Sequence, residues 1–113
     1  MTYDRIIAFA AAQAPGLETH PGLAVWRSEL SDDIADLHAR YGHVPDTRAD
    51  ELPVPERFAR MYALYYRARY EQATGDYDAA NAYMTDFIAA YNEYHTCLAR
   101  QYQTPGTGYT STL

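Results

Sequence analysis

The chain of 113 residues contains no lysine, and all nine of its basic residues are arginines. Its formal net charge of −6 argues against the concentrated positive surface that binding to nucleic acid requires. It has a single cysteine, Cys97, which excludes an internal disulfide and which we expect to be a buried helical thiol. It has no apolar run near the roughly 20 residues that span a bilayer. These absences leave an ordinary globular protein, since 48% of the residues are hydrophobic.

The sequence also lacks the ligand spacing of a metal site, which needs three or four converging side chains. His38 and His43 lie on either side of an expected helix end, while His95 and Cys97 are two residues apart and point to different helix faces. No general base accompanies Cys97, and no phosphate-binding or oxyanion loop occurs. We therefore expect no metal, no cofactor and no catalytic residue, and we interpret the protein as a non-enzyme.

Two long helices joined by one tight turn are predicted between Pro55 and Tyr102. Pro55 suits a first helical turn, Gly75 a left-handed helix end with positive φ, and Asp76 the cap of the next helix. Apolar residues recur at steps of three and four, which gathers them on one face of each helix. In the first helix these are Phe58, Met61, Tyr62, Tyr65, Ala68, Gln72 and Ala73, and in the second Ala80, Met84, Phe87, Tyr91, Tyr94 or His95, Leu98 and Tyr102.

Two further helices are predicted before this hairpin. Thr2 is a plausible cap for a helix over residues 3–14, which Pro15 stops. A second helix opens at Pro21, runs to residue 41 and closes at Gly42. Residues 43–54 have two prolines, are followed directly by Pro55 and show no periodicity, and we interpret them as an ordered loop that crosses the hairpin. The predicted fold is all-α, with about four helices in one domain over residues 1–102 and an extended arm over 103–113.

Tyrosine is over-represented, with twelve residues of which nine lie between positions 62 and 102. Either they fill a thin core or they form contacts with other chains, where aromatic residues are enriched. A second surface feature is acidic: Asp32, Asp33 and Asp36 cluster on the outer face of the second predicted helix. A solvated helix side is the ordinary explanation, and a site for a basic partner or a wall that faces DNA without binding it is the alternative.

The turn at Gly75, Asp76 and Tyr77 resembles the middle of a tetratricopeptide repeat, but Phe87 stands where that repeat has a small residue and no second copy follows. Residues 50–102 more closely resemble the head-tail connector, or adaptor, proteins of tailed bacteriophages. The resemblance rests on a pattern of small and aromatic residues: Pro55, Glu56, Arg57, Phe58, Ala63, Leu64, Tyr65, Tyr66, Ala68, Gly75, Asp76, Tyr77, Ala79, Ala80, Tyr83, Phe87 and Tyr91.

The resemblance implies a helical virion protein that forms a homo-oligomeric ring, commonly of twelve copies, below the portal protein. Such a ring joins head to tail, contacts tail or head-completion proteins, and extends the channel through which DNA passes without specific binding. No membrane is involved, and the protein would be made in the bacterial host cytoplasm, which agrees with the poor signal-peptide character of residues 6–14. In such a ring Asp32, Asp33 and Asp36 are candidate channel-facing residues.

The arm over residues 103–113 is small and polar and has little apolar surface for packing on its own domain. We expect it to lie along a neighbouring subunit or the portal, with Tyr109 as its anchor. The candidate partner-binding residues are Tyr66, Tyr70, Tyr102, Tyr109, Thr110 and Leu113. Two other functions stay open: a small regulator or inhibitor that binds one partner through a tyrosine-rich face, and an enzyme subunit with a shared site.

Overall fold

The computed structural model describes residues 1–43 and 50–102, and in this part of the chain it is all-α without a strand. Four α-helices and one 3₁₀ helix follow one another: α1 (Tyr3–Ala11), α2 (Leu23–Ala39), η1 (Glu56–Phe58), α3 (Arg60–Thr74) and α4 (Tyr77–Gln101). The predicted fold class is thus confirmed. The predicted arm over 103–113 and part of the predicted loop, residues 44–49, lie outside the described residues.

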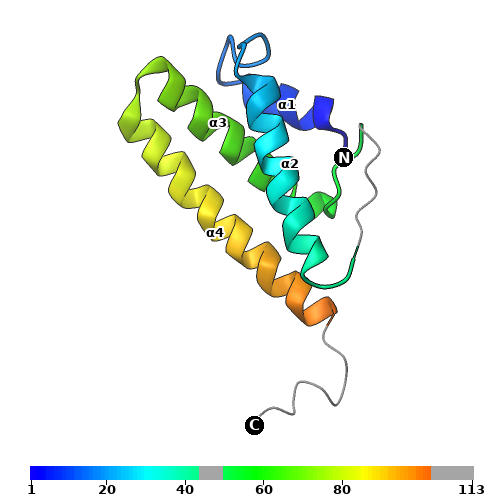
Figure 1. Ribbon diagram of the computed structural model, residues 1–113. Helices are drawn as coiled ribbons and strands as arrows, with labels where there is room; N and C mark the ends of the chain where they lie inside the picture. The colour runs from blue at the N-terminus through cyan, green and yellow to red at the C-terminus, as the bar shows by residue number, and fades with distance from the viewer. Residues whose placement is uncertain (44–49, 103–113) are drawn as a thin grey trace.

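α3 and α4 form the predicted antiparallel hairpin (Figure 1). Gly75 has a φ of 93°, in the left-handed region that L side chains rarely adopt, which confirms the predicted positive φ. Its neighbour Asp76 caps α4, because an oxygen of its carboxylate accepts a hydrogen bond from the amide of Ala79 at 3.1 Å. A chain reversal between two long helices therefore takes only two residues.

Four predicted helix ends shift by two to five residues, and one of them is the end of α2, which is Ala39 instead of residue 41. Pro15 has no amide hydrogen and its ring opposes the carbonyl of Ala11, so α1 ends at Ala11 instead of residue 14. α2 begins at Leu23 rather than at Pro21. Pro55 has an extended ψ of 150° and precedes a 3₁₀ turn, so α3 begins at Arg60 and not at Pro55. The predicted cap of α1 is confirmed, because the hydroxyl oxygen of Thr2 accepts a hydrogen bond from the amide of Arg5.

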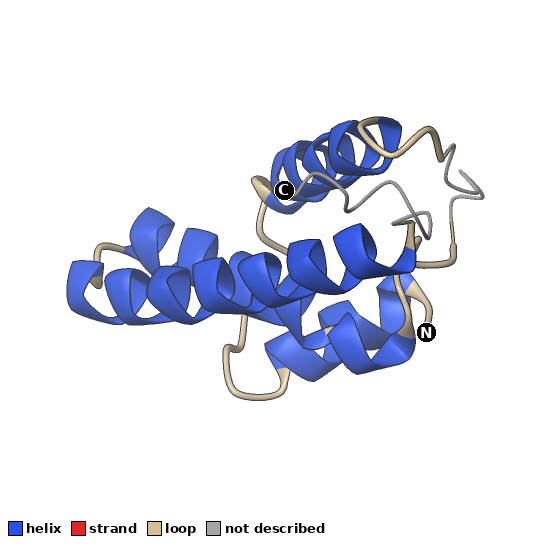
Figure 2. Cartoon of the chain, turned by 90° about the horizontal axis from the view of Figure 1, so that it is seen from below, coloured by secondary structure: helices blue, strands red, loops and turns tan. Residues whose placement is uncertain are grey.

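α3 is the central helix, because α1, α2 and α4 all pack against it. Figure 2 shows α1 and α2 on either side of the hairpin. All six residues from Met61 to Tyr66 are buried, so this part of α3 is covered on every side. Aromatic rings of this part of α3 contact the neighbouring helices. The ring of Tyr62 packs edge to face with that of Tyr3 of α1, and the ring centroids of Tyr65 and of Phe87 of α4 are 5.0 Å apart.

The far end of the hairpin projects beyond the other helices (Figure 1). Residues 72–78, which include the turn, are all exposed, since α1 and α2 cover only the opposite end of the hairpin. Over the described residues, no helix is long and apolar enough to cross a membrane. One end of the hairpin thus packs in the core, and the end with the turn projects away from it.

Candidate functional site

The tyrosines predicted to bind a partner divide between the core and the surface. Tyr66 has no exposed surface, so its side chain is a core residue and the prediction that it contacts a partner is not supported. Tyr70 is half-buried, and its hydroxyl donates a hydrogen bond to the carbonyl of Pro15 at 2.8 Å. Tyr102 is exposed and stacks on Tyr41. The remaining three predicted contact residues, Tyr109, Thr110 and Leu113, lie outside the described residues.

The buried tyrosines of α3 are electrostatically unusual. Burial raises the pKa of Tyr65 to about 12, and its hydrogen bond to Glu29 adds to the effect. Burial also raises the pKa of Tyr66, whose hydroxyl has no hydrogen-bond partner within the described part of the chain. These hydroxyls are therefore neutral at physiological pH. Their burial favours the core-filling explanation for the tyrosines of α3, one of the two alternatives left open by the sequence.

Two hydrogen bonds between histidine and tyrosine side chains join the end of α2 and the residues just after it to α4. The Nε2 atom of His38 lies 2.6 Å from the hydroxyl oxygen of Tyr94, and the hydroxyl of Tyr41 lies 2.8 Å from Nε2 of His95. We call these four residues the His–Tyr junction. The sequence pattern did not predict this junction, although His38 follows Ile34 by four residues and so extends the buried face of α2. The pairing depends on how α2 lies across α4.

His38 is the most buried member of the junction, with 1% of its surface exposed. Its Nδ1 atom has no hydrogen-bond partner among the described residues, and the ring of His43 lies 5.2 Å away. Burial, followed by the charge of His43, lowers the pKa of His38, because a protonated ring would place an unpartnered N–H in the core. The junction therefore favours a neutral His38.

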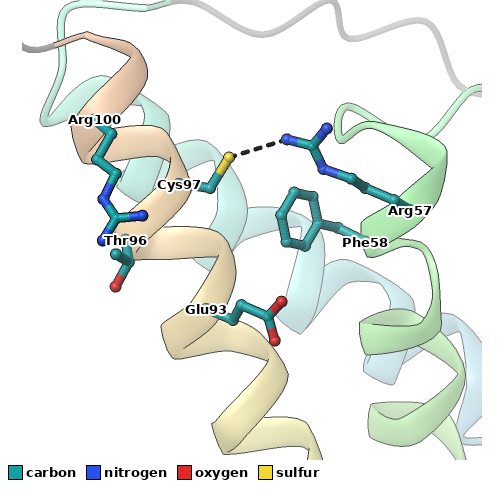
Figure 3. Close-up of a pocket in the computed structure, with 6 residues that line it drawn as sticks. All are labelled: Arg57, Phe58, Glu93, Thr96, Cys97 and Arg100. Atoms are coloured by element: carbon teal, nitrogen blue, oxygen red, sulfur yellow. Dashed lines mark hydrogen bonds between the residues drawn. The ribbon is translucent and has the colours of Figure 1, made fainter.

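A hollow of about 410 Å³ lies on the other side of α4, between η1 and the end of the helix (Figure 3). A guanidinium nitrogen of Arg57 lies 3.2 Å from the sulfur of Cys97 across it. The prediction of a buried thiol is therefore corrected, since Cys97 is half-buried and borders the hollow. The hollow has a mixed lining, made of Arg57, Phe58, Glu93, Thr96, Cys97 and Arg100.

A second hollow, of about 280 Å³, lies between α1 and the start of α3. Its lining combines apolar side chains with charged ones: Met1, Arg5, Ile6, Phe9, Glu56, Ala59 and Arg60. We call it the α1 groove. Phe9 on its edge is 67% exposed, which is unusual for a phenylalanine. Neither Arg5 nor Arg60 forms an ion pair with any residue in the described part of the chain.

The acidic cluster lies on α2 as predicted. Asp32, Asp33 and Asp36 are all exposed on the outer face of this helix, and the neighbouring Glu29 pairs with Arg69 of α3 at 3.3 Å. Partial burial, then the charges of Asp36 and Asp32, raises the pKa of Asp33. The three aspartates thus repel one another, and none of them forms an ion pair with another described residue. The cluster is a concentrated negative surface.

The described residues thus form two hollows and one acidic cluster on the surface of the molecule. Within residues 1–43 and 50–102, no three histidine, cysteine or acidic side chains converge in a way that could hold a metal ion. No family model, curated protein or solved structure matches this chain. The resemblance to phage connectors therefore stays a prediction, and the surfaces of the molecule carry the functional argument.

Proposed function

We propose that the protein is a structural head-tail connector of a tailed bacteriophage. Copies of the chain would form a ring, commonly of twelve in this class, below the portal protein, where the ring extends the DNA channel and joins head to tail. The residues behind the resemblance occupy positions that shape the fold: Pro55 precedes η1, and Gly75 with Asp76 makes the hairpin turn. This placement supports the proposal, which includes neither a catalytic role nor a cofactor.

The observation that carries the proposal is the presence of two unlike exposed surfaces on different sides of α3. One is the outer face of α4, on which Ile88 is 51% exposed, and the other is the α1 groove with Phe9 on its edge. A closed ring uses two different surfaces of each subunit, because every copy meets one neighbour with each. A symmetric dimer would need only one self-complementary surface.

The acidic cluster of Asp32, Asp33 and Asp36 suits the wall of a channel. Three neighbouring carboxylates that form no ion pair with a described residue repel phosphate, so DNA would pass along them without being held. Portal and tail proteins would contact the two ends of the ring. In this proposal the protein is a virion component with no contact to a membrane.

The alternative, a regulator that binds one partner through a tyrosine-rich face, receives less support. Among the described tyrosines the most exposed are Tyr77 and Tyr102, and they lie at opposite ends of α4. Most tyrosines between them pack against the core, so a continuous tyrosine face does not form. A regulator would then have to use a different surface from the one that its composition indicates.

Electron microscopy of native particles, with the copy number measured by quantitative mass spectrometry, tests the proposed function. The proposal requires a ring at the head-tail vertex with the same number of copies in every particle. A chain absent from particles, or present in variable amounts throughout the cell, would contradict it. The regulator predicts the second outcome, namely a complex of one copy with one soluble partner.

A further inference from the structure

We propose that the α1 groove of one copy binds the outer face of α4 of a second copy. This inference deepens the proposed function, on which it rests for the identity of the partner. It assigns the two unlike surfaces to each other by residue. α1, which forms one wall of the groove, and α4 lie on different sides of α3 (Figure 1), so the groove of one molecule cannot cover the outer face of its own α4.

The outer face of α4 is shaped to approach another helix closely. α4 buries only Ala80, Phe87, Tyr94 and Leu98, so the opposite half of the helix is exposed over its whole length. Its centre consists of small and acidic residues at helical spacing, which we call the α4 strip: Asp78, Ala82, Asp86 and Ala89. All four are exposed. Small side chains let a large side chain of the partner lie flat against the helix.

The α1 groove supplies the complementary shape. Phe9 projects from its edge with two-thirds of its surface exposed, and Ile6 with Ala59 forms an apolar floor. Covering exposed apolar surface of this kind with a partner stabilises the complex, because that surface is removed from water. The ring of Phe9 fits the strip between Ala82 and Ala89, which lie two turns apart on one face of α4. Ile88, 51% exposed, lies on the adjoining side of α4.

Charge selects this partner for the groove. Arg5 and Arg60 line the groove and form no ion pair within the described part of the chain. Asp78 and Asp86 of the strip likewise lack an ion-pair partner there. With one acidic residue, Glu56, beside these two arginines, the lining of the groove keeps a net positive charge. This charge would orient the acidic strip of the second copy and disfavour groove-to-groove pairing, where two positive linings would meet. The strip thus matches the groove in both charge and shape.

Charge reversal of the full chain tests the proposal, with mass measured by sedimentation equilibrium. The groove variant carries Arg5→Glu and Arg60→Glu, and the strip variant carries Asp78→Arg and Asp86→Arg. Each variant alone should self-associate at least about tenfold more weakly than the wild type, because like charges then face each other. A chain with all four substitutions restores both pairs and should recover association. This recovery would separate a lost contact from a damaged fold.

The matched control carries Asp32→Arg and Asp36→Arg on α2, which changes the net charge as much as the strip variant does. It should associate like the wild type. The proposal is overturned if the wild type stays monomeric at every soluble concentration, if the groove or strip variant associates normally, or if the four-substitution chain is folded but does not recover. If a closed ring still forms in all of these variants, the proposed interface is wrong and the proposed connector function stands. Charge-dependent open filaments would support the interface and overturn the ring.

Discussion

The two helices of the hairpin are antiparallel neighbours with four tyrosines each, yet they are buried to very different extents. α3 has six successive buried residues from Met61 to Tyr66, whereas α4, which is ten residues longer, buries only four along a single stripe. α3 is surrounded by three helices, and α4 touches the core with one face. Aromatic residues of α3 are thus buried in the fold, while most of the surface of α4 stays partly or fully exposed.

Substitutions on the buried and on the exposed side of α4 should differ most in their effect on the free energy of unfolding. Phe87 is buried against Tyr65 and Tyr91, so Phe87→Ala should lower the free energy of unfolding by about 3 to 5 kcal/mol. The adjacent Ile88 is half-exposed, and Ile88→Ala should change it by less than about 0.5 kcal/mol. Urea denaturation measures both. Equal losses at the two positions would mean that α4 is covered on both faces within one chain.

Acidification should weaken the attachment of α2 to α4. The pKa of His38 is lowered in the folded protein, so its neutral form contributes stability that is fully present above the ordinary pKa of 6.5. As the pH falls below that value the unfolded chain takes up the proton more readily, and stability decreases until the lowered folded pKa is reached. Urea denaturation at a series of pH values should show this decrease, and His38→Gln should flatten it. An unchanged slope in that variant would assign the effect to other groups.

Any side chain at the left-handed position of the turn between the two helices should lower the stability of the protein. A methyl group added at Gly75 would meet no atom within 4 Å, so Gly75→Ala isolates the backbone strain of a φ of 93°. The expected loss is roughly 1 to 2 kcal/mol, measured by thermal or urea denaturation. The matched control Gln72→Ala, at an exposed position one turn earlier, should have little effect. A stabilising Gly75→Ala would contradict the observed turn.

The smallest expected effect distinguishes two neighbouring hydroxyls of α3. Tyr65 donates a hydrogen bond to Glu29 at 2.9 Å, so Tyr65→Phe should cost about 1 to 2 kcal/mol. The hydroxyl of Tyr66 is buried without a described partner, so Tyr66→Phe should be neutral or slightly stabilising. Urea denaturation of the two variants side by side measures the difference. A clear loss for Tyr66→Phe would reveal a hydrogen-bond partner for that hydroxyl.

The features that the sequence predicted are those with local causes. Gly75 ends a helix because of its own backbone freedom, and Thr2 and Asp76 cap helices through amides three residues away. The stripe of α4 was predictable for the same reason, since a helix with one buried face repeats its apolar residues every three or four positions. A helix covered on all sides has no such asymmetry, and for this reason the full burial of Tyr66 was not predicted.

The contacts that the sequence did not predict join distant segments. The two hydrogen bonds of the His–Tyr junction connect residues 56 and 54 positions apart, and the contact between Arg57 and Cys97 spans 40. Each depends on the angle at which one helix crosses another, which many side chains determine together. That Arg5 and Arg60 of the α1 groove form no ion pair with a described residue could not be predicted for the same reason, because ion pairing depends on which residues surround each charge in space.

The most direct test of the account is single-particle cryo-electron microscopy of the full chain in its assembled state. The account predicts a closed ring in which the α4 strip of each subunit is covered by the α1 groove of the next, with Phe9 lying against Ala82 and Ala89. α3 should stay inside each subunit, and the acidic face of α2 should line the channel. A ring in which the α4 strip faces solvent, or a chain that forms no ring, would contradict the account.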